Sequence, residues 1–307
     1  MKRIAALLML LGALTACSAP AAEPLPEEPS HQEAVAVQPD ELQDTATFAQ
    51  AAPEELTYTV TLEPLEETAR DEDGTALVSR TYALPTMTVQ LEDGSVLEEA
   101  DTPEEAAALE AAGNFNGQFL EWAAADGFDE ITEWAREDRA LLAESGLEWH
   151  PYVLELACSV YQTEQLVSVR AEYYGNTGGA HPNTVLMAWN FDLTTGQFLQ
   201  PEQLAADGQD FFQAVQEKLA SRCRDTAAEH GMAPEEFFWT NYEEILASWS
   251  SYAVSFDETG MTVGFSPYEL ASYAAGAQEY CLPYEEIAAY LSDHSLVMLG
   301  LQPAEKN

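Results

Sequence analysis

The stretch that decides the fold covers residues 152–193 and reads YVLELACSVY, QTEQ, LVSVRAEYY, GNTGGAHPN, TVLMAWNFDL. The first, third and fifth of these parts are rich in β-branched and aromatic residues, which favour strands. We therefore expect three strands, at Tyr152–Tyr161, Leu166–Tyr174 and Thr184–Leu193. The connections between them are too short for a crossover, so neighbouring strands must run antiparallel. The centre of the chain is predicted to be an antiparallel sheet.

Towards the C-terminus, helical and strand patterns alternate. Residues 210–229 place Phe211, Val215 and Leu219 at helical spacing, which predicts an amphipathic helix. The elements that follow are expected to be a helix, two hairpin strands, a further strand and a closing helix, at Pro234–Leu246, Tyr252–Phe256, Met261–Phe265, Ala277–Leu282 and Pro283–Leu291.

Towards the N-terminus, a strand precedes a helical region. Residues 56–62 alternate apolar side chains with threonine, which is typical of a strand. The apolar run at residues 78–91 contains Pro85, which cannot donate to a sheet ladder, so an edge strand or a bent pair is expected there. Residues 103–144 are expected to be mostly helical, with interruptions near their glycines.

These patterns predict an α+β fold of antiparallel sheets with packed helices, arranged in two lobes. The lobes are expected at residues 54–151 and 152–303, which is enough chain for a substantial apolar core. Residues 17–53 are rich in Pro and Glu and nearly lack aromatic side chains. Such a segment cannot bury enough apolar surface to order itself, so a disordered tether is predicted.

Residues 1–16 have the layout of a secretory signal. Lys2 and Arg3 precede the apolar run Ile4–Leu14, which is too short to span a membrane. The next residues read LTAC up to Cys17 and resemble the bacterial lipobox, whose cysteine receives a lipid. The resemblance implies a lipoprotein held at the outer face of the cytoplasmic membrane through its lipid anchor. An ordinary signal peptide that is cut elsewhere is the alternative.

The chain is strongly acidic. It contains 54 acidic and 11 basic residues, for a formal net charge of −43. This excess argues against nucleic acid as a partner and against direct binding to anionic lipid. It favours a cationic partner, or it serves only solubility.

No recognised catalytic or cofactor motif is present. The sequence lacks the GxSxG elbow, the HExxH helix, the P-loop and the GxGxxG turn. No two histidines stand at a metal-ligand spacing, and we expect neither a metal nor a cofactor. Cys158, Cys223 and Cys281 allow at most one disulfide, and buried free thiols are the alternative.

One loop has unusual chemistry. It consists of Gly178, Gly179, Ala180, His181, Pro182 and Asn183. The glycines permit a sharp turn, and Pro182 restricts His181 to an extended backbone, so the imidazole is aimed. Either His181 pins the loop to the fold, or the loop is a recognition surface.

Three stretches resemble one known family. They read YYGNTGGAHPN at 173–183, NFDLTTG at 190–196, and GFSPYEL with YAAG at 264–276, followed by LPY at 282–284. In this order they are similar to the extracellular domain of RsiV-type anti-sigma factors, which also occurs in PdaC-type peptidoglycan deacetylases. The resemblance implies an α+β fold and an extracellular ligand-binding role. In the RsiV-type proteins that ligand is lysozyme.

The sequence also departs from these relatives. Only three residues precede the apolar run, so no cytoplasmic sigma-binding region is expected. The segment after Leu291 is too short for a deacetylase domain, so deacetylation is not expected either.

We therefore expect a non-enzymatic surface lipoprotein that binds a cationic protein such as lysozyme. A peptidoglycan- or glycan-binding module is the alternative, in which aromatic side chains near the motifs stack on sugars rather than joining the core. Outside the glycine loop, the candidate residues are Tyr174, Tyr268, Glu269 and Tyr273. A third hypothesis is an enzyme that pairs His181 with an acid such as Asp192 or Glu269.

Overall fold

The computed structural model describes residues 56–303. The predicted signal peptide, Cys17 and the tether lie outside the described residues. Residues 56–303 fall within a single compact unit. None of the helices in this range combines the length and the apolar character that crossing a membrane requires.

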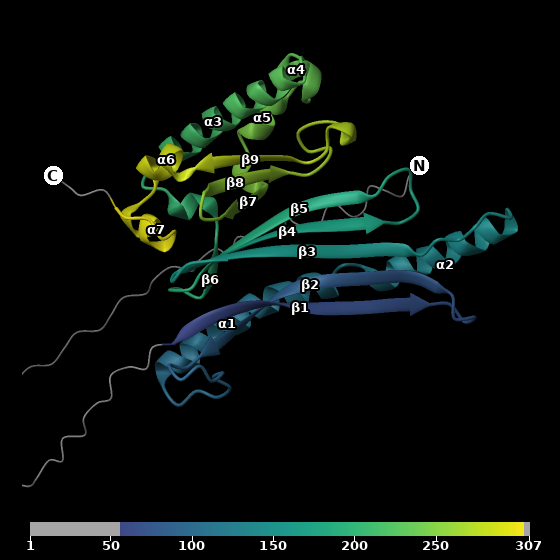
Figure 1. Cartoon of the computed structure of the whole chain (residues 1–307), viewed down its shortest axis with the longest axis horizontal. Helices are drawn as coiled ribbons and strands as arrows, with labels where there is room; N and C mark the ends of the chain where they lie inside the picture. The colour runs from purple at the N-terminus through teal and green to yellow at the C-terminus, as the bar shows by residue number, and fades with distance from the viewer. Residues whose placement is uncertain (1–55, 304–307) are drawn as a thin grey trace, which may run out of the picture. The chain divides into compact units, whose positions relative to one another are not determined.

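The larger of two sheets has six strands in chain order, and Figure 1 shows it running through the middle of the view. Its strands are β1 (Thr57–Arg70), β2 (Ala76–Gln90), β3 (Tyr152–Gln162), β4 (Leu166–Asn176), β5 (Asn183–Asp192) and β6 (Gln197–Leu199). All neighbours are antiparallel except β2 and β3, which run parallel. The α+β class is confirmed, but this sheet is mixed rather than purely antiparallel. The predicted lobe boundary at 151/152 lies between two paired strands of one sheet.

Two helices make the crossover that a parallel pair needs. They are α1 (Pro103–Ala124) and α2 (Phe128–Glu144). Thr102 caps α1 in a capping box with Glu105. The predicted interruption of this helix at its first glycines is wrong, because α1 runs through Gly113 and Gly117. Burial of Phe115, among other apolar side chains on one helix face, outweighs the cost of about 1 kcal/mol per glycine.

Strand β2 is an inner strand at one end and an edge at the other. Only residues 78–82 pair with β3, whereas Pro85 lies further along and pairs with Leu62 of β1. Beyond the proline, the side chain of Asn116 from α1 bonds both the N–H and the C=O of Met87, at 2.7 and 3.0 Å. Alternate residues of a strand direct their backbone nitrogens to the same side, so the nitrogen of Pro85, like that of Met87, faces away from β1. No strand of the described chain pairs with β2 on that side at Pro85, so the missing N–H leaves no acceptor without a partner.

Strand β1 lies at the outer edge of this sheet and pairs only with β2. Its exposed residues include Glu63, Pro64, Glu66 and Glu67. Charged side chains and a proline on an edge disfavour pairing with another strand.

A second, three-stranded antiparallel sheet contains β7 (Ala253–Phe256), β8 (Gly260–Phe265) and β9 (Gln278–Pro283). The long helix α3 (Gly208–Glu229) packs against it (Figure 1). The predicted helix at Pro234–Leu246 is instead two short helices, α4 (Pro234–Phe237) and α5 (Tyr242–Leu246). The predicted closing helix is also shorter, since it consists of α6 (Tyr284–Ile287) and a 3-10 turn. The remaining short elements are α7 (Asp293–Met298) and 3-10 turns at Pro201–Leu204, Trp249–Ser251, Tyr273–Ala275 and Ala288–Tyr290.

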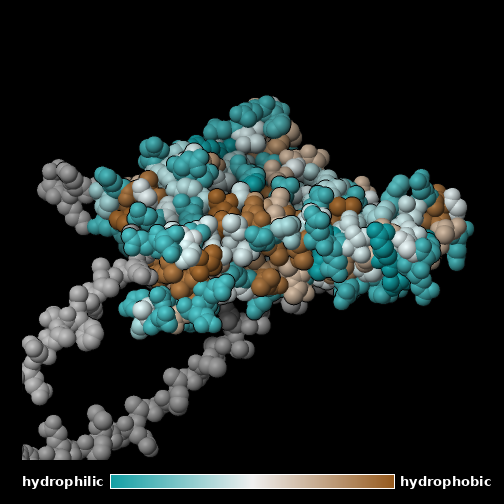
Figure 2. Space-filling model, turned by 60° about the horizontal axis from the view of Figure 1, so that its bottom comes forward, coloured by the Kyte–Doolittle hydropathy of each residue, from teal (hydrophilic) through white to brown (hydrophobic). Residues whose placement is uncertain are grey.

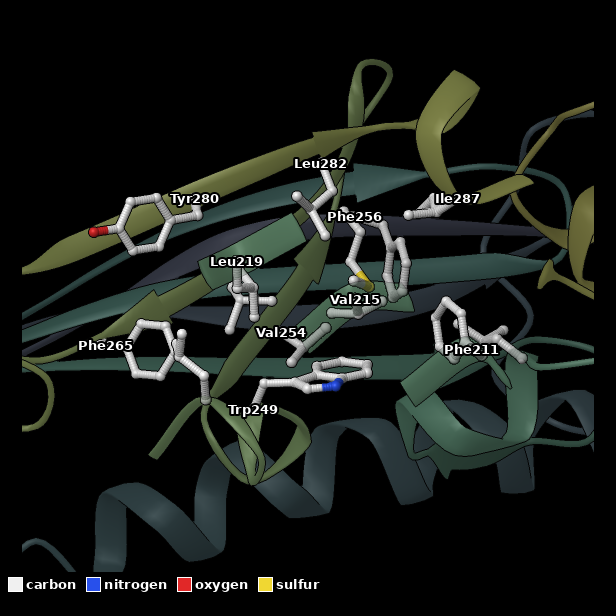
Figure 3. Close-up of a cluster of buried hydrophobic side chains, with 14 of the residues drawn as sticks. Phe211, Val215, Leu219, Trp249, Val254, Phe256, Phe265, Tyr280, Leu282 and Ile287 are labelled. Carbon is white, nitrogen blue, oxygen red and sulfur yellow. The ribbon is translucent and has the colours of Figure 1, made fainter. Parts of the chain in front are cut away.

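The core of this half lies between α3 and the three-stranded sheet. Figure 3 shows Phe211, Val215 and Leu219 of α3 pointing towards Trp249 and the strands. Cys223 is buried in the same cluster. Burial of such apolar side chains is the main favourable contribution to folding.

All three described cysteines are free thiols. Burial raises the pKa of Cys158 to about 12 and that of Cys223 to about 11. A thiol reacts as its thiolate, so the half-buried Cys158 and the buried Cys223 are poor nucleophiles at neutral pH. Cys281 is exposed.

A buried polar chain joins the two sheets. The N–H of Phe256 in β7 donates to Ser168 Oγ in β4, at 2.8 Å. Ser168 Oγ donates in turn to Asn190 Oδ1 in β5, and Asn190 Nδ2 donates to the C=O of Val254, both at 2.8 Å. Ser168 and Asn190 are 2% and 4% exposed, so these groups have no access to water as an alternative partner.

We predict that Asn190→Leu lowers the free energy of unfolding by about 2–4 kcal/mol, because it leaves the C=O of Val254 without its donor and the hydroxyl hydrogen of Ser168 without an acceptor. The control is Asn183→Leu, which makes the same change at an exposed position of the same strand and should alter stability by no more than about 0.5 kcal/mol. Chemical denaturation measures both. Equal losses would contradict the role assigned to Asn190.

Candidate ligand-binding site

The glycine loop connects β4 to β5 at the surface. Gly178 has a φ of +73°, and a Cβ there would come within 3.2 Å of the ring of Tyr152. Its N–H donates to Asn176 Oδ1 at 3.2 Å. The positive φ and the close approach to Tyr152 therefore both favour glycine at this position. Of the predicted loop residues, Pro182 is half-buried and the other five are exposed: Gly178, Gly179, Ala180, His181 and Asn183.

His181 contacts a second loop. Its Nδ1 lies 2.9 Å from the carbonyl oxygen of Pro182, and its Nε2 lies 3.1 Å from the hydroxyl of Tyr268. A carbonyl only accepts, so Nδ1 carries the hydrogen, and Nε2 of the neutral ring accepts from the hydroxyl of Tyr268. The imidazole also stacks on Tyr273, with centroids 3.8 Å apart and planes inclined by 18°. His181 both pins its loop and remains exposed.

Tyr268 has a strained backbone. Its φ of +75° is the only positive value found at a non-glycine residue within 56–303. Such a conformation costs of order 1–3 kcal/mol and persists only where neighbours enforce it. Here the indole Nε1 of Trp239 donates to the backbone carbonyl of Tyr268 at 2.9 Å, and the hydroxyl of Tyr268 bonds His181. Despite these two contacts, Tyr268 remains 55% exposed.

Glu269 builds the turn that carries Tyr268. Its carboxylate accepts from the N–H of Ser266 at 2.5 Å, and Ser266 Oγ accepts from the N–H of Leu186 in β5 at 3.1 Å. Burial raises the pKa of Glu269. Glu269 thus positions the turn, and its recorded bonds do not include His181.

The structure brings together some of the predicted residues and not others. His181, Tyr268 and Tyr273 meet. Tyr174 lies on β4, pairs with Thr184 and has no recorded contact with these three. Asp192 accepts hydrogen bonds from Thr194 and Thr195 in its own turn. The pairing of His181 with Asp192 or Glu269 that the enzyme hypothesis needs is not among the contacts of the described chain.

Sequence reasoning missed Trp239. It lay inside the predicted helix Pro234–Leu246, directly after two other aromatic residues. That run of three aromatic side chains in a supposedly amphipathic helix was the available signal, because it leaves no polar face. We call His181, Trp239, Tyr268 and Tyr273 the aromatic cluster.

The aromatic cluster offers recognition chemistry. Exposed aromatic faces stack on sugar rings, on cations or on partner side chains, and the hydroxyl groups can bond polar groups. Within residues 56–303, no group of His, Cys, Asp and Glu is arranged to hold a metal ion.

The raised pKa of Glu269 has a consequence for stability. The folded protein holds this proton to higher pH than the unfolded chain, whose ordinary value is 4.5, so its contribution is present at low pH and is lost as pH rises through the folded pKa. Relative to Glu269→Gln, which keeps an acceptor for Ser266, the wild-type free energy of unfolding should fall as pH increases above about 4.5. Denaturation at a series of pH values measures this difference. A flat or rising difference would contradict it.

Comparison with known proteins identifies the fold. No family model and no curated protein sequence matches this chain. The crystal structure of a DUF3298 family member from Bacteroides fragilis NCTC 9343 matches with a TM-score of 0.52 and 18% identity, covering 80% of this chain and 96% of that one. A DUF3298 family protein from Pseudomonas aeruginosa PAO1 gives 0.44 and 15%, covering 80% and 97%. DUF3298 is the domain family of the RsiV-type and PdaC-type extracellular domains. The chain therefore shares the fold of the Bacteroides fragilis structure.

Proposed function

We propose that this protein is a non-catalytic lipoprotein, held outside the cytoplasmic membrane by a lipid on Cys17, which binds an envelope-associated ligand through the aromatic cluster. The observation that carries the proposal is the strained, exposed Tyr268, which His181 and Trp239 hold in place from separate segments. Such strain is found at ligand-binding positions more often than elsewhere.

Lysozyme is the favoured ligand because of charge. The net charge of −43 attracts a strongly basic protein and accelerates its association. Many basic side chains of the described chain are already paired with acids, including Arg80, Arg139 and Arg170. Hydrophilic residues cover most of the face in Figure 2, with apolar residues exposed between them.

Calorimetric titration of the purified full chain with lysozyme at physiological salt tests the proposal. Tyr268→Asn removes the aromatic ring and hydroxyl but tolerates a positive φ, and it should weaken binding about thirtyfold if Tyr268 is a central contact. The control is Trp134→Ala on α2, which removes a comparably exposed aromatic side chain, 44% against 55%, and should leave the affinity unchanged.

Lysozyme binding that depended on charge alone would behave differently. Nonspecific attraction would weaken steeply with salt and would be indifferent to Tyr268→Asn. No binding at about 50 µM would remove lysozyme as the ligand.

Peptidoglycan is the second candidate. The specific observation in its favour is that Tyr268 and Trp239 are exposed next to each other, at 55% and 37%, as in a stacking platform for sugars. Co-sedimentation of the full chain with purified cell wall separates the two ideas. Retention that Tyr268→Asn abolishes, without lysozyme binding, would favour the glycan.

A further inference from the structure

A cleft of about 830 Å³ lies beside the N-terminal half of α3. One side is α3, and the other includes α5 and the 3-10 turn at Pro201–Leu204. Its volume falls in the range of about 300–1,000 Å³ that is usual for ligand sites. No residue of the aromatic cluster lines it.

The floor of the cleft is apolar. Phe212 and Ala220 of α3 are half-buried, and Leu246 of α5 is fully buried. The ring of Phe212 is fixed by Trp249, with centroids 4.9 Å apart. A ligand must therefore offer an apolar surface of its own to displace water from this floor.

The rim of the cleft carries only negative formal charge. Glu202, Glu217 and Glu243 are exposed along it, and no Lys or Arg is among the lining residues. None of the three takes part in an ion pair recorded for residues 56–303. Gln213 Nε2 holds the carboxylate of Glu217 at 3.0 Å.

Two of the three basic side chains of α3 pair with an acid outside this rim. Lys218 and Arg222 bind Glu286 of α6 instead, at 3.6 and 2.6 Å. The third, Arg224, is not among the lining residues, and no ion pair joins a basic side chain of α3 to Glu202, Glu217 or Glu243 within residues 56–303.

An apolar floor under an acidic rim matches one kind of group. Lysine and arginine side chains combine an aliphatic stem with a cationic head, so the stem can cover the floor while the head reaches the carboxylates. Anions are repelled, and a bare inorganic cation leaves the floor unused.

We propose that this cleft binds an arginine- or lysine-bearing segment of a partner protein. The proposal is independent of the function assigned to the aromatic cluster, since the two sites share no residue. The partner segment alternates apolar and basic residues, because floor and rim lie side by side.

The probe is a fluorescent hexapeptide amide that alternates leucine and arginine, titrated into the full chain at 150 mM salt and followed by fluorescence anisotropy. The matched peptide carries citrulline, which keeps the stem and removes the charge. We expect saturable 1:1 binding of the arginine peptide and at least about tenfold weaker binding of the citrulline peptide.

Two charge-matched variants locate the site. Glu202→Gln, Glu217→Gln and Glu243→Gln combined should weaken binding about tenfold. The control combines Glu92→Gln, Glu98→Gln and Glu99→Gln, which are exposed residues next to β2, and it should leave the affinity unchanged. Gln216→Trp, which keeps all three carboxylates but fills the cleft, should also abolish binding.

Several results would overturn the proposal. They are absence of binding at about 50 µM, equal binding of the two peptides, equal losses in the two triple variants, and full binding by Gln216→Trp. Circular dichroism spectra that match the wild type ensure that a lost affinity reports on the cleft rather than on unfolding.

Discussion

The relative placement of the two sheets depends on the buried hydrogen-bonded chain that links Ser168 and Asn190 to β7. Apolar packing alone has no direction, and it would tolerate several alignments of the sheets. Buried polar groups tolerate only the alignment that satisfies them, because each orphaned group costs free energy. With β7 fixed on β4 and β5, the turn after β8 reaches Leu186 through Ser266. The same alignment brings Tyr268 to His181.

Much of this fold could be predicted because it follows from local patterns. The three strands within 152–193 were placed to within two residues, and the hairpin of β7 and β8 was also found. The parallel pairing of β2 with β3 could not be read from either strand, because it arises from contacts across a crossover of about sixty residues. The continuity of α1 through Gly113 depends on burial of Phe115, which local propensity does not include.

The site was predictable as a set of residues but not as an arrangement. His181, Tyr268 and Tyr273 were named because they lie in the resembling stretches, yet nothing in their spacing placed the imidazole on the ring of Tyr273. Glu269 was named for the same reason, and its carboxylate instead supports the turn from within. Trp239 was missed because its role is one hydrogen bond to a backbone carbonyl. The run of three aromatic residues that ends at Trp239 marks the segment as unusual, but it does not indicate this bond.

The acidic outer edge of β1 governs how copies of this protein meet one another. A strand of fourteen residues with an open edge is long enough to template a neighbouring chain. Glu63 and Glu66 would bring like charges against an approaching copy, and Pro64 interrupts the row of donors. Two copies that approach along this edge are therefore disfavoured from adding strand to strand, which opposes fibril growth at high local concentration.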